Sequence, residues 1–432
     1  MQRIVINGGK PLSGRVPVSG SKNATLPLMA ATLLGRSPSV IRNVPDLRDV
    51  QTMADVLRSL GATVDFSEHT MRIDPAGFSN TEAPYDMVRK MRASIYVMGP
   101  MLARLREAKV SLPGGCAIGS RPVDLHLKGF QELGADIALE HGYILAKTNG
   151  LRGAEFNLSG AAGSSVGATC NVVMAACLAS GTTVIRGAAC EPDVVELMDF
   201  LTKMGARIEG SGTSTITVQG VESLEGIVHS VVSDRIEAGT FMTAAAITRG
   251  DLIIENCPSM HMEATISKMQ EIGVVFEDVG DGLRVRGNAG DFRRTDIQTA
   301  TYPGFPTDMQ AQLMAFLATV PGTSIIKETI YVDRFLHAAE LVRLGASIRV
   351  LSGIATIEGV ERLSGAPVMA SDLRASAALV VAGLAAEGTT IVNRVYHIDR
   401  GYESIEKKLR DVGATIARVS DNEPDDATTP PF

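Results

Sequence analysis

The feature that most constrains the fold is a short motif that recurs six times along the chain. Each copy is an apolar residue, a glycine and then alanine or valine, and it closes an amphipathic helical pattern. The glycines follow one another at intervals of 68 to 73 residues. A glycine directly after a helix is typical of the left-handed C-terminal cap, which strains other residues. We therefore expect six copies of one structural unit, marked by Gly61, Gly134, Gly205, Gly273, Gly345 and Gly413.

Each unit is expected to combine a buried helix, a strand, an amphipathic helix and further strands. The stretches 164–181 and 371–388 are small and apolar on every side, as in a helix buried in a core. In the first copy, the apolar stripe at helical spacing consists of Val50, Met53, Val56, Leu57 and Leu60. This alternation of elements predicts a mixed α/β fold built from six repeated units.

The start of the chain resembles a later stretch, which predicts how the units are grouped. Residues 5–23 read like residues 356–374, so we expect the first strands to complete the sixth unit. Three units then form each of two domains, and a solenoid is disfavoured because shorter repeats and polar caps are absent. The predicted domains are residues 21–233, and residues 1–20 together with 234–420. Residues 421–432 are acidic and Pro-rich, and we expect a disordered tail there.

Composition excludes several classes of protein. The net charge of −7 disfavours general nucleic-acid binding. Neither a P-loop motif nor a strand-coupled GxGxxG motif is present, which disfavours those nucleotide sites. The start lacks a signal-peptide pattern, and the longest apolar stretch is too short to span a bilayer. Five cysteines without a CxxC pair disfavour a disulfide framework or structural zinc. We expect a cytoplasmic protein that does not insert into membranes.

Polar residues mark the starts of the buried helices, where a core helix does not need them. These residues are Lys22, Asn23, Arg92, Ser165, Glu237, Asp308 and Arg374, and the loops add Arg121, Arg334 and Arg400. A helix N-terminus already favours anions through its N–H groups and dipole. Lysine and arginine at such positions therefore indicate a site for phosphate or carboxylate groups, although any single arginine can equally be a solvated surface residue.

Cys116 differs from the other cysteines in its surroundings. It lies in a glycine-rich stretch near Arg121, and a nearby cation lowers the pKa of a thiol. Cys170 and Cys177 fall in a buried helix, and Cys190 and Cys257 lie at strand-to-loop junctions, where packing roles are expected. Cys116 is therefore the candidate reactive thiol, with an unreactive loop cysteine as the alternative.

Several motifs together resemble the UDP-N-acetylglucosamine 1-carboxyvinyltransferases, a family of enolpyruvyl transferases. They include SGSKNATLP, RASIYVMGP, LPGGCAIGSRPVDLH, SSVGAT, FPTDMQAQ, ETIYVDRF and HIDRGY, in order along nearly the whole chain. The resemblance implies two inside-out α/β barrel domains of three units each. It also implies transfer of the enolpyruvyl group of phosphoenolpyruvate to the 3-hydroxyl of UDP-N-acetylglucosamine, with release of phosphate. This reaction is the first committed step of peptidoglycan synthesis.

The resemblance also assigns roles to residues. It implies catalytic roles for Cys116, Asp308, Lys22 and Arg400. Phosphoenolpyruvate contacts are implied for Lys22, Arg92, Arg121, Arg374 and Arg400. UDP-N-acetylglucosamine contacts are implied for Asn23, Arg92, Arg121, Pro122, Val123, Asp124, Leu125, Ser165, Val166, Gly167, Asp308, Ile330 and Arg334. Some members of the family place a lysine where this chain has Gly163, so one contact to the diphosphate is expected to differ.

The implied chemistry needs a proton donor, a proton acceptor and fixed cations, but no metal or organic cofactor. Cys116 would protonate phosphoenolpyruvate or assist product release, and Asp308 would take the hydroxyl proton. The epoxide fosfomycin is expected to label Cys116. Two alternatives are an enzyme that uses shikimate 3-phosphate as the acceptor and a silent paralogue that binds the sugar nucleotide and regulates the pathway. The CAIGSRPVD and SVGAT stretches favour UDP-N-acetylglucosamine, and retention of Cys116 and Asp308 favours an active enzyme.

Overall fold

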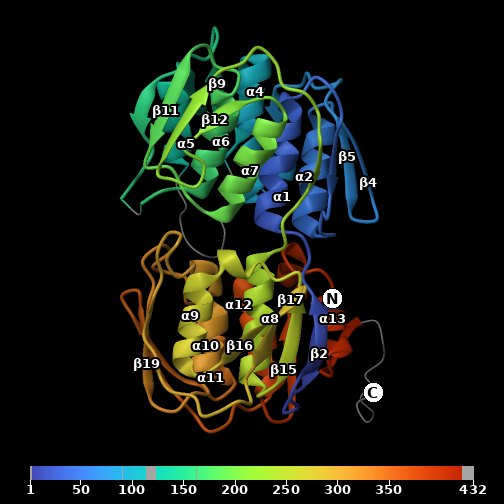
Figure 1. The fold of residues 1–432 in the computed structure, drawn as a ribbon, viewed down its shortest axis with the longest axis vertical. Helices are drawn as coiled ribbons and strands as arrows, with labels where there is room; N and C mark the ends of the chain where they lie inside the picture. The colour runs from blue at the N-terminus through green and yellow to red at the C-terminus, as the bar shows by residue number, and fades with distance from the viewer. Residues whose placement is uncertain (1, 90, 113–122, 162, 421–432) are drawn as a thin grey trace. The chain divides into compact units, whose positions relative to one another are not determined.

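A computed structural model describes residues 2–420 except 90, 113–122 and 162. The candidate residues Cys116, Arg121 and Pro122 lie outside the described residues, as does the expected tail at 421–432. Within the described residues the chain divides into two compact units (Figure 1). The central unit comprises described residues of 20–232, and the terminal unit comprises 2–19 and 233–420.

The central unit contains three sheets of four strands among its described residues, all with one topology. In each sheet the first pair of strands is parallel and the other two pairs are antiparallel. In spatial order the sheets are β14 (Val228–Ser230), β3 (Ser39–Arg42), β5 (Thr70–Asp74) and β4 (Thr63–Ser67); β6 (Glu82–Ala83), β7 (Glu107–Ser111), β9 (Tyr143–Lys147) and β8 (Asp136–Glu140); and β10 (Glu155–Asn157), β11 (Thr182–Arg186), β13 (Thr215–Gln219) and β12 (Arg207–Glu209).

Helices fill the interior of the central unit. Almost every residue of the helices α1 (Lys22–Ala31) and α6 (Val166–Ala176) is buried, because their small apolar side chains allow packing on all sides. The amphipathic helices bury only one face each. The remaining helical segments are α2 (Arg48–Ser59), α3 (Tyr85–Val88), α4 (Met98–Leu105), α5 (Asp124–Glu132), α7 (Pro192–Lys203) and the 3-10 turns η1 (Thr32–Leu34) and η2 (Arg92–Val97).

The terminal unit repeats this architecture. Its described residues also form three four-stranded sheets with one parallel and two antiparallel pairs. They are β16 (Val275–Val279), β17 (Gly282–Arg286), β15 (Asp251–Glu255) and β2 (Ser13–Pro17); β18 (Ile297–Gln298), β19 (Thr323–Lys327), β21 (Ile354–Glu358) and β20 (Ser347–Leu351); and β22 (Pro367–Met369), β23 (Thr389–Asn393), β1 (Gln2–Asn7) and β24 (Thr415–Ser420).

The core of the terminal unit is again built from almost fully buried helices, here α8 (Arg235–Ile247), α10 (Gln310–Leu317) and α12 (Leu373–Ala385). Amphipathic helices α9, α11 and α13 cover them with one apolar face each. The helical segments are α8 (Arg235–Ile247), α9 (Glu263–Ile272), α10 (Gln310–Leu317), α11 (Leu336–Arg343), α12 (Leu373–Ala385), α13 (Ile405–Asp411) and the 3-10 turns η3 (Ser259–His261), η4 (Thr307–Met309) and η5 (Val395–Arg400).

The predicted mixed α/β fold of six repeated units is confirmed. All six marker glycines have positive φ, between 87° and 117°. Each lies between an amphipathic helix and the strand that follows, as the capping argument requires.

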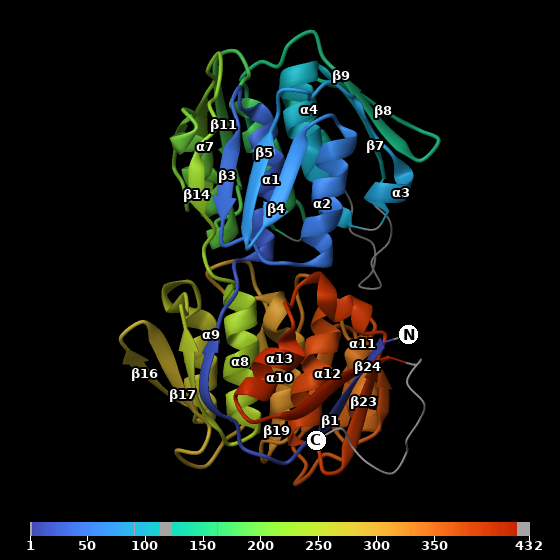
Figure 2. The same cartoon turned by 90° about the vertical axis from the view of Figure 1, so that its right-hand side faces the viewer.

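The expectation for the first strands is right for one strand and wrong for the other. Strand β1 completes the sixth sheet by pairing with β23 and β24. Strand β2 instead pairs with β15 of the fourth sheet, in parallel from Ser13 to Pro17. The N-terminal strands, blue in Figure 2, thus lie among strands of the later half of the chain. Strands β2 and β22 are similar in sequence, and each pairs in parallel at the end of its sheet. Because the partner of a parallel strand lies far along the chain, the similarity predicted how β2 would pair but not with which strand.

Candidate active site

In the central unit, the first turn of α1 carries a lysine that is held by a buried carboxylate. Lys22 begins the helix, and its Nζ lies 3.3 Å from Oδ2 of Asp49 in the first turn of α2. The two side chains are only 12% and 5% exposed, so solvent screens this ion pair little. Asn23 follows in the same turn and is partly buried. The ammonium group of Lys22 is therefore fixed in position as a candidate anion contact.

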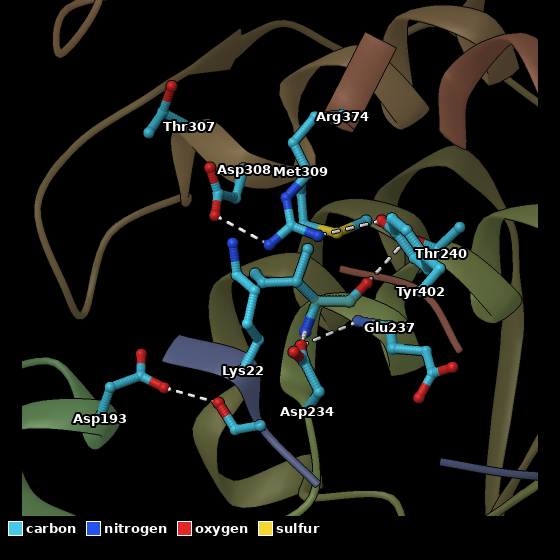
Figure 3. A network of polar contacts seen from close by, with 12 residues as sticks. Lys22, Asp193, Asp234, Glu237, Thr240, Thr307, Asp308, Met309, Arg374 and Tyr402 are labelled. Atoms are coloured by element: carbon cyan, nitrogen blue, oxygen red, sulfur yellow. Dashed lines mark hydrogen bonds and ion pairs between the residues drawn. The ribbon is translucent and has the colours of Figure 1, made fainter. Parts of the chain in front are cut away.

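A second buried carboxylate fixes the start of the same helix. The hydroxyl of Ser21 accepts a hydrogen bond from the backbone N–H of Ala24 and so caps α1. It also donates to Oδ1 of Asp193 in the first turn of α7, at 2.9 Å. The dashed line that starts at Asp193 in Figure 3 marks this hydrogen bond. Helices α2 and α7 thus each supply one carboxylate that holds the first turn of α1.

A neutral histidine of α5 lies beside the buried helix α6. Burial, and secondarily the charge of Arg92, lower the pKa of His126 to about 3, so the ring is uncharged at neutral pH. The amide oxygen of Asn171 accepts from the backbone N–H of Gly99, so its nitrogen is the donor toward Nδ1 of His126, at 3.1 Å. The ring proton is then on Nε2. His126 is therefore a packed, neutral residue.

The N-terminus of α6 has the form of an anion-binding helix start. Ser165 caps the helix by accepting from the backbone N–H of Ala168, and Val166 and Gly167 form its first turn. A side chain at position 167 would begin 3.1 Å from Nε2 of His126, so glycine allows the start of α6 to pack closely on this ring. Gly163 has a φ of 92° and pairs with Gly160 through two backbone hydrogen bonds. A lysine at position 163 would adopt this conformation only with strain.

The start of α5 lies against this same region. Asp124 is the first residue of α5, Val123 precedes it, and Leu125 is the nearest side chain to Gly160. The structure thus brings the predicted stretch 123–125 next to the turn that precedes Ser165–Gly167.

In the terminal unit, a carboxylate is held by two arginines. Asp308 lies in η4, directly before α10. Its Oδ1 accepts from Arg334 at 2.7 Å, and its Oδ2 accepts from Arg374 at 3.0 Å (Figure 3 shows the second contact). The arginine side chains are 5% and 3% exposed, whereas the aspartate side chain is 28% exposed. The carboxylate is thus accessible, while both of its partners are buried.

Glu328 connects two predicted site residues of the terminal unit. It is 2% exposed, and its Oε2 accepts from the hydroxyl of Thr307, the neighbour of Asp308. Its Oε1 accepts from the backbone N–H groups of Ile330 and Tyr331 at 2.8 and 3.0 Å. One buried carboxylate therefore fixes both the turn that carries Asp308 and the loop that carries Ile330.

The guanidinium of Arg374 lies in a buried polar network at the start of α12. Asp372 caps this helix, and Nη1 of Arg374 donates to the hydroxyl of Tyr402 at 3.1 Å. Arg400 ends η5, and the next residue, Gly401, packs so closely on Leu373 that a side chain there would displace the leucine. This contact places the backbone beside Arg400 at the first residue of α12.

The site residues predicted from the sequence thus form two groups. The central unit holds Lys22, Asn23, Arg92, Val123, Asp124, Leu125, Ser165, Val166 and Gly167, and the terminal unit holds Asp308, Ile330, Arg334, Arg374 and Arg400. Three residues that hold them, Asp49, Glu328 and Tyr402, were not predicted from the sequence. A signal existed for Asp49, because it falls on the apolar stripe of its helix with Met53 and Val56, where a charge needs a partner.

The described residues show neither a membrane span nor a metal cluster. In this part of the chain, no helix is long and apolar enough to cross a membrane. Nor does it contain a group of three or more His, Cys, Asp and Glu side chains that could hold a metal ion.

Comparison with known proteins gives one family along almost the entire chain. The family model for EPSP synthase (3-phosphoshikimate 1-carboxyvinyltransferase) matches residues 6–409. The chain is 54% identical over 419 residues to the UDP-N-acetylglucosamine 1-carboxyvinyltransferase of Methylacidiphilum infernorum, covering 97% of this chain and 99% of the relative. It is 52% identical over 421 residues to the enzyme of the same name from Geobacter metallireducens, covering 98% and 100%.

Solved structures agree on the fold. The enolpyruvyl transferase NikO from Streptomyces tendae superimposes with a TM-score of 0.88 at 24% identity, covering 97% of this chain and 99% of that one. EPSP synthase from Acinetobacter baumannii gives a TM-score of 0.73 at 17% identity, covering 97% and 100%. The architecture of six four-stranded sheets is thus shared with both proteins.

Proposed function

The chain belongs to the UDP-N-acetylglucosamine 1-carboxyvinyltransferases, within the EPSP synthase family, and we propose how its own residues carry out the transfer. The enzyme moves the enolpyruvyl group of phosphoenolpyruvate to UDP-N-acetylglucosamine in peptidoglycan synthesis. The observation that carries this assignment is 54% identity along 97% of the chain. The fixed cations and the accessible carboxylate of the two units supply the groups that the reaction needs.

The basic residues are proposed to bind the two anionic groups of phosphoenolpyruvate. Lys22, Arg121 and Arg400 contact its phosphate and carboxylate, and Arg92 and Arg374 support them. Lysine offers a compact charge and arginine a planar pair of donors, which suits a substrate with two different anions. The ion pair between Lys22 and Asp49 supports this role, because it fixes the ammonium group before substrate binds.

The sugar nucleotide is proposed to use the helix starts of the central unit and a loop of the terminal unit. The backbone N–H groups at Ser165, Val166 and Gly167 suit the diphosphate, since a helix N-terminus attracts anions. The other proposed contacts are Asn23, Arg92, Arg121, Pro122, Val123, Asp124, Leu125, Asp308, Ile330 and Arg334. The backbone N–H of Ile330 donates to Glu328, and this bond supports a fixed position for the loop that is proposed to contact the acceptor sugar.

The chemical step is proposed to be addition followed by elimination. The 3-hydroxyl oxygen of the sugar bonds to C2 of phosphoenolpyruvate, its proton passes to Asp308, and Cys116 delivers a proton to the methylene carbon. The tetrahedral intermediate then loses phosphate from C2 and a proton from the new methyl group, which forms the enol ether. The two arginines favour the ionised form of Asp308, and a carboxylate oxygen can accept more than one hydrogen bond.

We further propose that the two compact units are the two enolpyruvyl transferase domains, the first of which carries Cys116, and that the enzyme works in the cytoplasm. Its described cysteines, 170, 177, 190 and 257, are free thiols, which fits a reducing compartment.

A phosphate-release assay tests the proposed function. Phosphoenolpyruvate should release phosphate at a high rate with UDP-N-acetylglucosamine, and at background rate with shikimate 3-phosphate or with no acceptor. Excess chelator should leave the rate unchanged, because fixed side-chain cations carry out the charge stabilisation. Equal rates with both acceptors would contradict the proposed specificity, and loss of activity that magnesium restores would contradict the metal-free mechanism.

A further inference from the structure

The hydroxyl of Tyr402 occupies a position in which the direction of every hydrogen bond is determined. Tyr402 and Thr240 are each 1% exposed, and their oxygens lie 2.8 Å apart (Figure 3). The hydroxyl of Thr240 donates to the backbone carbonyl of Ile236 at 2.8 Å. A hydroxyl has one proton, so Thr240 must accept from Tyr402 rather than donate to it.

The phenol oxygen is consequently an acceptor on its other side. Its own proton is directed at Thr240, and it accepts from Nη1 of Arg374 at 3.1 Å and from the amide nitrogen of Gln312 at 3.3 Å. Because both hydroxyl protons are already used, the amide of Gln312 must present its nitrogen to the pair, and it also donates to Thr240 at 3.1 Å. Burial raises the pKa of the Tyr402 phenol, partly offset by Arg374, so the group is a hydroxyl at neutral pH.

Arg374 is therefore held at two points. Nη1 is bonded to Tyr402, and Nη2 is bonded to Oδ2 of Asp308 at 3.0 Å. Because a guanidinium is planar and rigid, fixing one nitrogen sets the direction in which the other points. The second partner of Asp308 differs in this respect, since Arg334 is steadied by the hydroxyl of Thr307, in the turn of Asp308 itself.

We propose that Tyr402 is a positioning residue, whose hydroxyl orients Arg374 and thereby fixes the carboxylate of Asp308 for proton transfer. Tyr402 itself contacts neither substrate in this proposal. It acts through the order Thr240, Tyr402, Arg374, Asp308: Arg374 donates to both Asp308 and Tyr402, and Tyr402 donates to Thr240. The inference rests on the role of Asp308 as proton acceptor under the proposed function.

The test is the pH dependence of kcat in Tyr402→Phe. Phenylalanine keeps the ring but removes the acceptor for Arg374, so Asp308 loses part of its fixed charge partner and is protonated at higher pH. We expect kcat at neutral pH to fall about tenfold, as for loss of a hydrogen bond to a charged group, and the acid limb of the profile to move up by at least about half a pH unit. Tyr143→Phe is the matched control, because that hydroxyl accepts one backbone N–H in the central unit, and its profile should match wild type.

Two further variants keep the inference falsifiable. Thr240→Val keeps the phenol of Tyr402 but removes the hydroxyl that accepts its proton. This variant should shift the acid limb of the pH profile in the same direction by a smaller amount. If Tyr402→Phe does not fold, Thr240→Val decides the question. An unshifted acid limb in whichever of these variants folds overturns the inference, even if the amount of active enzyme falls. Asp308→Asn tests the premise separately: if it turns over at the wild-type rate, the proposed role of Asp308 fails, whatever Tyr402→Phe shows.

Discussion

The two units are built from the same repeat, but they hold opposite charges at their candidate sites. In the central unit a cation is held by a carboxylate, because Asp49 fixes Lys22. In the terminal unit a carboxylate is held by cations, because Arg334 and Arg374 fix Asp308. In each case the partners are more deeply buried than the group they hold.

This difference shows how one architecture can divide a reaction into two tasks. A fixed ammonium group binds anions, whereas a fixed carboxylate can accept a proton. In both units the site residue lies at or directly before a helix start, and buried partners hold its charged group in place. Substitutions in the two units should therefore change different kinetic parameters.

The largest expected effect is the difference in alkylation rate between Cys116 and the buried cysteines. Burial raises the pKa of Cys170, and it raises those of Cys177 and Cys257 to about 12. A thiol with an ordinary pKa of about 8.5 has a thiolate fraction more than about 1000-fold larger at neutral pH. We therefore expect Cys116 to be alkylated at least about 1000-fold faster than these three, and mass mapping after iodoacetamide or fosfomycin treatment measures this.

Cys116→Asp serves as the control for the thiol prediction. A carboxylic acid can still donate a proton, so the variant should keep some turnover while it loses the modification. Labelling mainly at Cys170 or Cys190 in the native protein would show that the reactive thiol has been assigned wrongly.

Asp308→Asn should give the next largest effect. An amide keeps the shape of the side chain but cannot take the hydroxyl proton, so kcat should fall about 1000-fold, within the range for a general base. Steady-state phosphate release measures kcat, and the KM for phosphoenolpyruvate should change much less. A variant that retains a tenth of the wild-type kcat would contradict the assignment.

The same substitution in the central unit, Asp49→Asn, should instead act on KM. Lys22 loses a charge-assisted hydrogen bond, so its ammonium group is less well placed, and the KM for phosphoenolpyruvate should rise tens of fold. Asp49→Glu should restore part of the affinity.

Asp193→Asn is the matched control, since both aspartates precede their marker glycines by twelve residues and both hold the first turn of α1. It should lower the midpoint of thermal unfolding with little change in this KM, because its partner is Ser21. A larger KM effect from Asp193→Asn than from Asp49→Asn would break the comparison.

The repeat could be predicted from the sequence alone, whereas the partner that each charged residue contacts could not. The marker glycines and apolar stripes are local patterns, so the six units could be predicted from the order of residues alone. The partner of β2 and the network around Tyr402 depend on contacts between residues far apart in the chain. Glu328 illustrates the limit: within TSIIKETI it looks like a solvated charge after a strand, yet four donors surround it when the chain folds.

A pair of histidines offers the finest test of the comparison between units. His126 and His337 each precede their marker glycine by eight residues, and both are buried. Burial lowers the pKa of His126 to about 3 and that of His337 to about 4. His126 is hydrogen-bonded to Asn171, whereas Nε2 of His337 has no hydrogen-bond partner among the described residues.

Both histidines should weaken the fold as pH falls below their unfolded pKa of about 6.5. The unfolded state then binds a proton that the folded state does not, so stability rises with pH between about 3 or 4 and 6.5. From pH 7 to pH 5.5 each histidine should cost about 1 kcal/mol of unfolding free energy. Urea denaturation of His126→Gln and His337→Gln measures this, and each variant should lose about 1 kcal/mol less than wild type over that interval. If only one variant flattens the pH dependence of the unfolding free energy, the two histidines are not equivalent, and this feature is not shared by the two units.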